Sequence, residues 1–566
     1  MYNCENCGYK TGKIFETDAE NYPKNIKSKK GDKIFVCKRC FDEWDERNYF
    51  TEKIIESKKE DRKIILAGPG TGKTYAFQRY IEEFDKKDSI YITTFINNLV
   101  DDLKKDLGKN IEERNIEVST FHKFCYRLLK LVGKDCDYCP DLTDLIIEDI
   151  GVIKASLINE ERLRKNLNNY KATHDIKLYF ERGNYYNAIG NDNIFFALLK
   201  VLEARGGIDL SKYYRQIIID EYQDFNFAES SIIKIISRNN KILIAGDDDQ
   251  ALYTFKGSDP KYIRELWEST EFYKLELPFC QRCTEVIIDS FHCFIKQAQA
   301  RGLLQDRKAK KYKYYFPDKY RDSKKYHKIF WYRTSIRNKK FESIVKILVN
   351  NIVNYTKEKE IIEGKLNFLI ICPRERNSMC KTIKERVIEE LKKLGLPIID
   401  CERKSKKDSL LIRNGYGFLE NNKKSNLGWR IIIKNDPLEG WEEIIKNTGE
   451  KAKNIFDLLP PDYKNRHLKF LEKLGEEQIV ESKNKEGLNL LFTNFCGAKG
   501  LSADHVFVLF PQNGIFPSNP SNINNDEIYK FLVALTRSRK SLNLITIFPH
   551  RSEFIEMLPR ANIRVV

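Results

Sequence analysis

A glycine-rich loop carries the clearest chemical signal in this sequence. A short apolar segment ending at Leu66 predicts a buried strand, and residues 75–84 predict a helix. The loop between them consists of Ala67, Gly68, Pro69, Gly70, Thr71, Gly72, Lys73 and Thr74. Backbone N–H groups in such a loop bind phosphates, Lys73 would contact the β- and γ-phosphates, and the Thr74 hydroxyl would ligate Mg²⁺. We therefore predict a binding site for a nucleoside triphosphate and magnesium.

Two further apolar segments end in acidic residues. Residues 216–219 lead into Asp220 and Glu221, and residues 242–245 lead into an acidic run that ends at Gln250. Such continuous apolar runs are typical of buried parallel strands, whose carboxyl ends meet at one edge of a sheet. We expect Asp220 to face the magnesium ion, Glu221 to activate the attacking water, and Gln250 to sense the γ-phosphate. Three such strands in this order predict an α/β ATPase core.

Four cysteines near the start of the chain have the spacing of a metal site, namely Cys4, Cys7, Cys37 and Cys40. Each CxxC pair places two thiolates on one tight turn, and two turns complete a tetrahedral site for zinc. The long gap between the pairs requires an inserted loop or hairpin. Four thiolates leave no open coordination position, so we predict a structural Zn²⁺. The alternative is two unrelated pairs of free thiols, which is how we interpret the pairs at residues 136/139 and 280/283.

The composition describes a long basic chain. Its 566 residues include 99 Lys and Arg against 82 Asp and Glu, a net charge of +17, and its 12% aromatic content excludes a disordered protein. No apolar run reaches the ~18 residues of a membrane helix, and the first residues do not form a secretory signal. We expect a soluble, cytoplasmic, multidomain protein with no membrane partner. The excess charge indicates a polyanion such as nucleic acid, although it could also serve solubility alone.

In their order along the chain, these motifs resemble those of superfamily 1 helicases of the UvrD/Rep/PcrA type. Residues 67–74, 220–224 and 246–258 resemble the first three main motifs of that family. Residues 497–501 and 533–539 resemble its fifth and sixth motifs, and residues 92–97 and 119–122 resemble its single-strand-contacting motifs. The resemblance covers about residues 60–550 and excludes the cysteine segment.

The resemblance implies two RecA-like α/β motor domains with ATP between them. Arg282 and Arg537 fall on the family's fourth- and sixth-motif arginines and would stabilise charge on the γ-phosphate. Each could instead be an ordinary surface arginine. Lys499 and Gly500, in the fifth motif, would complete the nucleotide contacts.

The same resemblance implies a track for single-stranded DNA. Aromatic side chains would stack on bases, and polar ones would hydrogen-bond to phosphates or sugars. The aromatic set is Phe95, Tyr253 and Phe255, and the polar set is Thr94, Asn97, Thr120 and His122. His122 could equally be a structural histidine.

Three departures from the family concern the base and the ribose. The family reads adenine with a glutamine upstream of the glycine-rich loop, and no glutamine precedes Gln78 here. Gln281 stands where the family often stacks a tyrosine, and Ser502 stands where it has a ribose-contacting glutamate. We therefore expect intact phosphate chemistry with altered recognition of base and ribose.

The motif positions predict a division of the chain into a small N-terminal zinc module and two motor domains with helical insertions. We assign residues 1–50 to the zinc module, 51–100 and 206–285 to motor domain 1A, 101–205 to a helical 1B insertion, 286–439 and 488–566 to motor domain 2A, and 440–487 to a reduced 2B insertion. A 2B segment this short would lack the family's full hinged motion. The basic and aromatic stretch 307–316 predicts either part of a DNA track or a solvated loop.

We predict an ATP-dependent translocase or helicase on single-stranded or tailed duplex DNA, in DNA repair or antiviral defence, and the resemblance implies 3′–5′ movement. Its cofactors would be ATP, Mg²⁺ and Zn²⁺, and a nuclease or another protein could be a partner. The alternative is a nucleotide-gated nucleic-acid sensor or recruiting subunit that hydrolyses ATP without processive unwinding.

Overall fold

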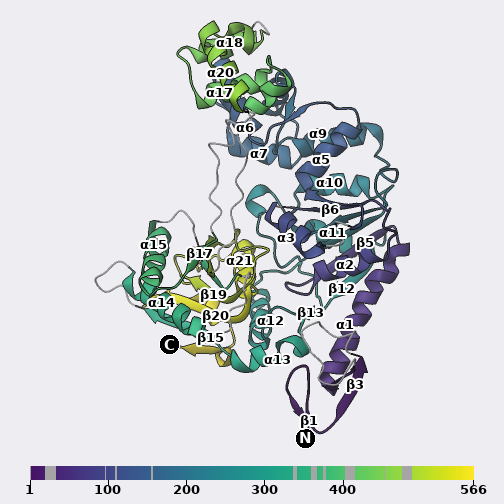
Figure 1. The fold of residues 1–566 in the computed structure, drawn as a ribbon, viewed down its shortest axis with the longest axis vertical. Coiled ribbons are helices and arrows are strands. Elements are labelled where there is room, and N and C mark those ends of the chain that lie inside the picture. The colour runs from purple at the N-terminus through teal and green to yellow at the C-terminus, as the bar shows by residue number, and fades with distance from the viewer. Residues whose placement is uncertain are drawn as a thin grey trace.

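The structure is a computed structural model whose elements are labelled in Figure 1. It describes all residues except 1, 19–32, 96, 109–110, 112, 155–156, 335–340, 358–365, 374–377, 402–414, 451–452 and 475–486. Among the residues it describes, none of the helices is both long and apolar enough to cross a membrane.

The first sheet has six parallel strands in the order β12-β5-β11-β10-β6-β7. Its strands are β5 (Arg62–Ala67), β6 (Ile90–Thr94), β7 (Ile116–Thr120), β10 (Gln216–Ile219), β11 (Ile242–Gly246) and β12 (Tyr273–Leu277). The strands before the glycine-rich loop, before Asp220 and before the run ending at Gln250 are parallel, as the sequence predicted, and lie side by side in the spatial order β5-β11-β10. Strand β7 also belongs to this sheet, although residues 101–205 were assigned to the 1B insertion.

Helices cover both faces of this sheet. One face carries α2 (Lys73–Glu82) and α3 (Asn97–Leu107), whose apolar side chains pack on every second residue of the strands, such as Ile65 and Ile218. The other face carries α5 (Phe121–Leu131), α9 (Ile194–Arg205), α10 (Phe227–Ile236) and α11 (Lys261–Glu268). Because both faces are covered, the central strands β5, β11 and β10 need no polar side, which explains their apolar runs, whereas the edge strands β7 and β12 carry charged residues.

The second sheet has seven parallel strands in the order β17-β18-β16-β19-β20-β15-β21. They are β15 (Ile329–Thr334), β16 (Phe368–Cys372), β17 (Ile398–Asp400), β18 (Leu488–Asn494), β19 (Ala503–Leu509), β20 (Ser538–Ile547) and β21 (Ile563–Val565). Helices α14 (Glu342–Lys357) and α15 (Ser378–Lys393) cover one face, and α12 (Glu285–Ala300) and α21 (Asn525–Leu535) cover the other. Two helix-covered parallel sheets confirm the predicted pair of RecA-like domains.

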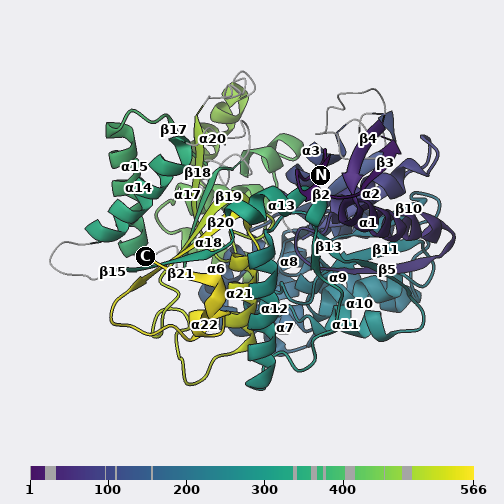
Figure 2. The ribbon, with the colours of Figure 1, turned by 90° about the horizontal axis from the view of Figure 1, so that it is seen from below.

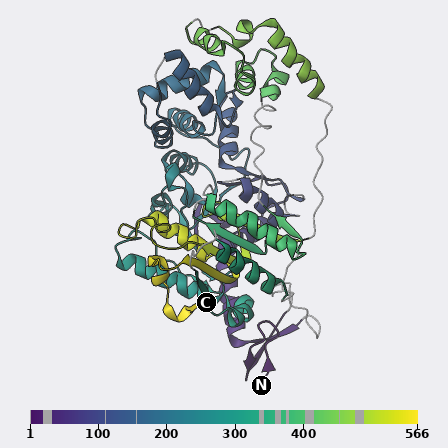
Figure 3. The same ribbon diagram turned by 90° about the vertical axis from the view of Figure 1, so that its left-hand side faces the viewer.

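A separate helical lobe lies at the end of the molecule opposite the N-terminus (Figures 1 and 3). Its own core joins α6 (Leu142–Lys154), α7 (Glu160–Asn168) and α8 (His174–Tyr185) to α17 (Asn426–Asn435), α18 (Trp441–Glu450), α19 (Ile455–Leu458) and α20 (Pro461–Leu474). Helix α17 packs here and not on the second sheet, although residues 426–439 were assigned to domain 2A. Its buried face, which includes Leu427 and Trp429, explains this placement.

One buried carboxylate ties the two halves of this lobe together. Asp149 on α6 accepts from Arg182 on α8 at 2.7 Å and from Arg430 on α17 at 2.7 Å. All three side chains are almost completely buried. Glu148, which is partly exposed, makes a second contact with Arg430 at 2.9 Å.

The N-terminal segment is built on the motor core. Two short antiparallel pairs, β1 (Tyr2–Asn3) with β2 (Lys10–Thr11) and β3 (Ile14–Asp18) with β4 (Lys33–Cys37), precede the long helix α1 (Lys38–Glu56). The pair β3/β4 is the hairpin that the gap between the cysteine pairs requires. Helix α1 runs past residue 50 and packs on α2, β12 and α13 (Phe316–Lys325). Figure 2 shows α13 between this segment and the second sheet.

The basic and aromatic stretch 307–316 is only partly exposed to solvent, with Ala309, Lys311 and Lys313 exposed, and its part in a DNA track stays a prediction. Lys310 is 1% exposed and contacts Asp247, Asp248 and Asp249. Tyr312, Tyr314, Tyr315 and Phe316 are buried as well. The charges of Arg307 and Lys310 are buried because they pair with buried carboxylates, whereas Lys308 and Lys313 pair with exposed glutamates.

The Asp149 network generates a stability prediction. Asp149→Ala leaves two buried guanidinium groups without their carboxylate, which costs about 3–5 kcal/mol for a buried pair. We expect the helical lobe to unfold at lower urea concentration, measured by the fluorescence of Trp429 and Trp441, which lie in its core. The matched control is Glu148→Ala, whose partly exposed pair should contribute about 1 kcal/mol or less. Equal effects of the two variants would contradict this account.

Candidate nucleotide site

The glycine-rich loop connects β5 to α2 and forms a tight phosphate cradle. Gly70 and Gly72 have φ of +70° and +87°, values that disfavour any side chain. A Cβ at Gly68 would lie 2.5 Å from the Tyr312 ring, and one at Gly70 would lie 2.5 Å from Arg282 Cβ. The loop glycines are thus required both by backbone conformation and by the close approach of segments from beyond the first sheet.

The acidic pair lies directly opposite the loop lysine. Lys73 Nζ is 3.7 Å from Glu221 Oε1, and the Glu221 backbone N–H donates to Asp220 Oδ1 at 2.9 Å. Glu221 is a non-glycine residue with φ of +57°, a conformation that turns its side chain toward the lysine. Burial raises the pKa of Asp220, and the charge of Glu221 raises it further. Burial would also raise the pKa of Glu221, but Lys73 and Lys499 outweigh it and lower this pKa, so Glu221 is ionised.

Two residues that the sequence analysis did not select hold this pair in place. Gln223 Nε2 donates to Glu221 Oε2 at 2.5 Å, and its Oε1 accepts from the Asp247 backbone at 3.0 Å. Asp224 forms a buried ion pair with Lys499, whose Nζ also lies 3.5 Å from Glu221 Oε2. The position of Gln223 and Asp224 in the run 220–224 is the signal that could have identified them.

The second domain contributes cations to the same cavity. Arg537 Nη2 donates to Gln250 Oε1 at 2.5 Å, and Gln250 Nε2 donates to Asp247 Oδ2 at 2.6 Å. Arg282 Nη1 donates to the Thr536 carbonyl at 3.4 Å. Burial, with the nearby charge of Arg282, lowers the pKa of Arg537 to about 9, so its guanidinium remains protonated at neutral pH.

These groups line one cavity of about 610 Å³ between the two sheets. Its lining includes most of the predicted nucleotide residues, namely Gly68, Gly70, Thr71, Gly72, Lys73, Thr74, Asp220, Glu221, Gln250, Arg282, Lys499, Gly500 and Arg537. Ala67, the last residue of β5, is buried beneath the loop and does not line it. The Thr74 hydroxyl and the Asp220 carboxylate are oxygen donors in this cavity, which suits them to Mg²⁺.

The predicted DNA-contacting aromatic residues form a second cluster. Phe95 and Tyr253 are buried with ring centroids 4.9 Å apart, and Phe255 is 68% exposed at 6.0 Å from Tyr253. Lys256, which the sequence analysis did not select, places its Nζ within 5.3–5.9 Å of all three rings. An exposed ring backed by two others and a cation suits stacking on an unpaired base.

The predicted polar contacts are less accessible. Thr94 is fully buried, and Thr120 caps α5 by accepting from the Lys123 backbone at 3.4 Å. His122 packs on Phe195 with centroids 4.6 Å apart, and burial lowers its pKa to about 4. Asn97 begins α3, and its side chain lies outside the described residues.

Comparison with known proteins identifies the class to which these sites belong. The family model of the UvrD/REP helicase N-terminal domain matches residues 48–149 and 141–271, which contain the phosphate loop, the acidic pair and the aromatic cluster. A probable DNA helicase II homolog from Mycoplasma capricolum is 23% identical over 85% of this chain and 81% of its own length. The first motor domain of this chain is therefore similar to the UvrD/REP helicase N-terminal domain.

Other relatives match shorter stretches. The ATP-dependent DNA helicase PcrA of Staphylococcus epidermidis is 26% identical over 42% of this chain and 38% of its own length. The ATP-dependent DNA helicase Rep of Escherichia coli is 24% identical over 35% of this chain and 36% of its own length. The chain therefore aligns with under half of either relative, and the family match centres on the first motor domain.

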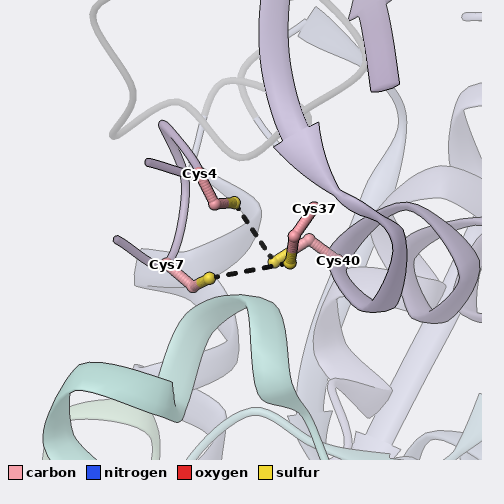
Figure 4. A group of neighbouring side chains, drawn as sticks. All are labelled: Cys4, Cys7, Cys37 and Cys40. Atoms are coloured by element: carbon pink, nitrogen blue, oxygen red, sulfur yellow. Dashed lines mark hydrogen bonds between the residues drawn. The ribbon is translucent and has the colours of Figure 1, made fainter. Parts of the chain in front are cut away.

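The four N-terminal cysteines converge at one point and precede the residues that match the family model (Figure 4). Cys4 Sγ lies 3.8 Å from Cys40 Sγ, and Cys7 Sγ lies 3.9 Å from Cys37 Sγ. All four side chains are buried. Four thiolates around a tetrahedral zinc at ~2.3 Å would be about 3.8 Å apart, so the cluster fits Zn²⁺.

A group of three carboxylates also meets the geometric requirements for a cation. Asp247, Asp248 and Asp249 converge, but Lys310 contacts all three. Arg307 donates to Asp249 at 2.7 and 2.9 Å, and Arg264 to Asp248 at 2.9 Å. These protein cations neutralise the group, which therefore serves to anchor the segment after α12 beneath the third motif.

Proposed function

We propose that this chain hydrolyses ATP and uses the energy to move 3′ to 5′ along single-stranded DNA and to displace the paired strand. The observation that carries the proposal is the meeting of Lys73, Glu221 and Arg537, from both motor domains, in one buried cavity. The distances between these three side chains change when the two domains move relative to one another. Hydrolysis is thereby coupled to domain motion.

Each group has a role that its surroundings support. Loop N–H groups and Lys73 bind the phosphates, which draws Lys73 away from Glu221. The ionised Glu221, held by Gln223, then accepts a proton from the attacking water. Gln250 links the γ-phosphate region to Arg537, and Arg282 and Arg537 stabilise the charge that develops there. Thr74 and Asp220 would hold Mg²⁺, which supplies electrostatic stabilisation of the β- and γ-phosphates.

The aromatic cluster supports a nucleic-acid role in the same first domain. Phe255 offers its exposed face to a base, and Tyr253 and Lys256 hold it in place. Stacking of bases on aromatic rings does not depend on the nucleotide sequence, and an enzyme that moves along DNA needs contacts of this kind. In the nucleotide-gated sensor, which remains the second candidate, the same residues would bind DNA without strand displacement.

We also propose that the four cysteines bind one structural Zn²⁺ per chain. The spacing of the sulfur atoms and their burial support this assignment. The cluster lies against α13 and not in the nucleotide cavity, so the metal takes no part in hydrolysis.

The chemistry is tested by two variants of the cavity. Glu221→Gln should still bind ATP, because only the group that accepts the proton of the attacking water is removed. Its rate of DNA-stimulated hydrolysis should fall by at least about 10²-fold. Lys73→Ala should lose hydrolysis and weaken ATP binding, because a phosphate contact is lost as well. Phosphate release and equilibrium ATP binding are measured on the same samples. Hydrolysis at the unaltered rate in Glu221→Gln would remove that residue from its role.

The substrate is tested by comparing ATP hydrolysis with single-stranded DNA, duplex DNA and RNA, followed by displacement of a 3′-tailed duplex. Phe255→Ala should weaken single-stranded DNA binding by about 5- to 100-fold, since one stacked base contributes about 1–3 kcal/mol. Tyr273→Ala, another partly exposed aromatic, at the start of β12, is the matched control. Displacement of a 5′-tailed duplex alone would contradict the polarity, and hydrolysis without any displacement would favour the sensor.

Zinc is tested by metal analysis of the purified chain. We expect about one zinc per chain and four thiols protected from alkylation until a chelator is added. Cys125, which is buried and outside the cluster, provides the internal control for general unfolding. Absence of metal with all four cluster thiols reactive would refute the assignment.

A further inference from the structure

Two carbonyl groups of the phosphate loop are held by donors from outside the loop. The Tyr312 hydroxyl donates to the Pro69 carbonyl at 2.8 Å, and this contact is buried. The next carbonyl in the loop, that of Gly70, accepts from the Gln281 backbone N–H at 2.9 Å. Both donors come from segments that follow the first sheet in the chain, and Tyr312 lies 243 residues after Pro69.

The direction of these carbonyl groups decides where the loop N–H groups point. In a planar trans peptide, the carbonyl and the N–H point to opposite sides. Pro69, Gly70 and Thr71 line the nucleotide cavity, whereas the buried Tyr312 lies behind the loop. A hydrogen bond that draws the Pro69 carbonyl toward Tyr312 therefore turns the Gly70 N–H toward the cavity. Successive N–H groups turned to one side form a site for phosphate, and a carbonyl turned the same way would repel it.

The Tyr312 ring is fixed by packing on both of its sides. On the loop side, a Cβ at Gly68 would lie 2.5 Å from a ring carbon, so the ring lies directly against the loop backbone. On the other side, the centre of the Phe291 ring lies 5.0 Å away. The Tyr312 carbonyl is held as well, 2.7 Å from His292 Nε2. The hydroxyl therefore has one position, under the Pro69 carbonyl.

The segment that carries Tyr312 is anchored before and after this residue. Two residues earlier, Lys310 is enclosed by the three carboxylates that follow β11. Directly after it, β14 (Lys313–Tyr314) pairs with β13 (Phe279–Cys280). Strand β13 leads into Gln281, so this pairing fixes both donors to the loop relative to one another.

From these contacts we infer that Tyr312 is a positioning residue for nucleotide binding. Its hydroxyl holds the Pro69 carbonyl away from the cavity and so keeps the Gly70 N–H directed at the phosphates. The inference rests on the proposed function of the phosphate loop. It gives the stretch 307–316 a part in nucleotide binding, because the tyrosine acts on the loop from behind and not from within the cavity.

The first test compares equilibrium binding of ATP and of inorganic tripolyphosphate, each with Mg²⁺, to the full chain by calorimetry. Tyr312→Phe keeps the ring and removes the hydroxyl. It should weaken binding of both ligands by the same factor, about 3- to 10-fold, the size of one hydrogen bond between uncharged groups. Tyr126→Phe is the matched control, because it removes a hydroxyl that donates to the Cys136 carbonyl at 2.7 Å, away from the cavity. It should alter neither affinity.

Each other outcome has one meaning. Unaltered affinity for both ligands in Tyr312→Phe overturns the inference. A loss for ATP alone overturns it as well, since the hydroxyl would then act on the base or the ribose and not on the phosphates. An equal loss in Tyr126→Phe would assign the effect to general stability, with the same result. Failure of the unaltered chain to bind either ligand overturns the proposed function instead.

The second test uses steady-state hydrolysis to separate positioning from catalysis. Loop N–H groups contact the phosphates both before and during the reaction, so their loss weakens the ground state and the transition state alike. Tyr312→Phe should therefore raise the KM for ATP by about 3- to 10-fold and leave kcat within about twofold. A fall in kcat at unchanged KM would place the hydroxyl in the transition state and overturn the positioning role.

Discussion

Buried charge must be paired, and in this protein the pairs join segments that are far apart in sequence. Lys499 in the second domain lies against Asp224 and Glu221 in the first. Lys310 is enclosed by the carboxylates that follow β11. An unpaired charge in these places would be costly, so each pair holds the chain in one arrangement. The nucleotide cavity exists because these pairs bring the edges of two sheets together.

Much of the cavity was predictable because its signals are local. A strand, a glycine-rich loop and a helix are contiguous, and Asp220 follows a run of apolar residues, so the sequence places both groups at the carboxyl ends of parallel strands; β11 lies between those two strands. Lys73 and Glu221 meet as expected. The first parallel sheet followed from the same reasoning, since continuous apolar runs indicate strands covered on both faces, whereas the second was implied by the family resemblance.

Other features depend on contacts that no local pattern records. Helix α17 has the apolar stripe of any amphipathic helix, and only its partner Asp149 shows that it packs on the helical lobe. The sequence of residues 307–316 suggests a solvated loop because it shows the charged residues but not the buried carboxylates that pair with Arg307 and Lys310. Thr94 and His122 match single-strand motifs in sequence, yet Thr94 is fully buried and the partly buried His122 packs on Phe195. Burial is a property of the tertiary structure, and spacing does not encode it.

The strand order of the first sheet has a consequence for synthesis of the chain. Strand β5, which carries the phosphate loop, pairs with β11 and β12, and these end at residues 246 and 277. A ribosome has therefore made nearly half of the protein before β5 gains either neighbour. Until then its apolar edges are open to wrong pairings. The helices between β7 and β10 emerge first, and contacts among them, such as α6 with α8, can shorten the gap that β11 must close, although the core of α6, α7 and α8 is completed only by α17–α20.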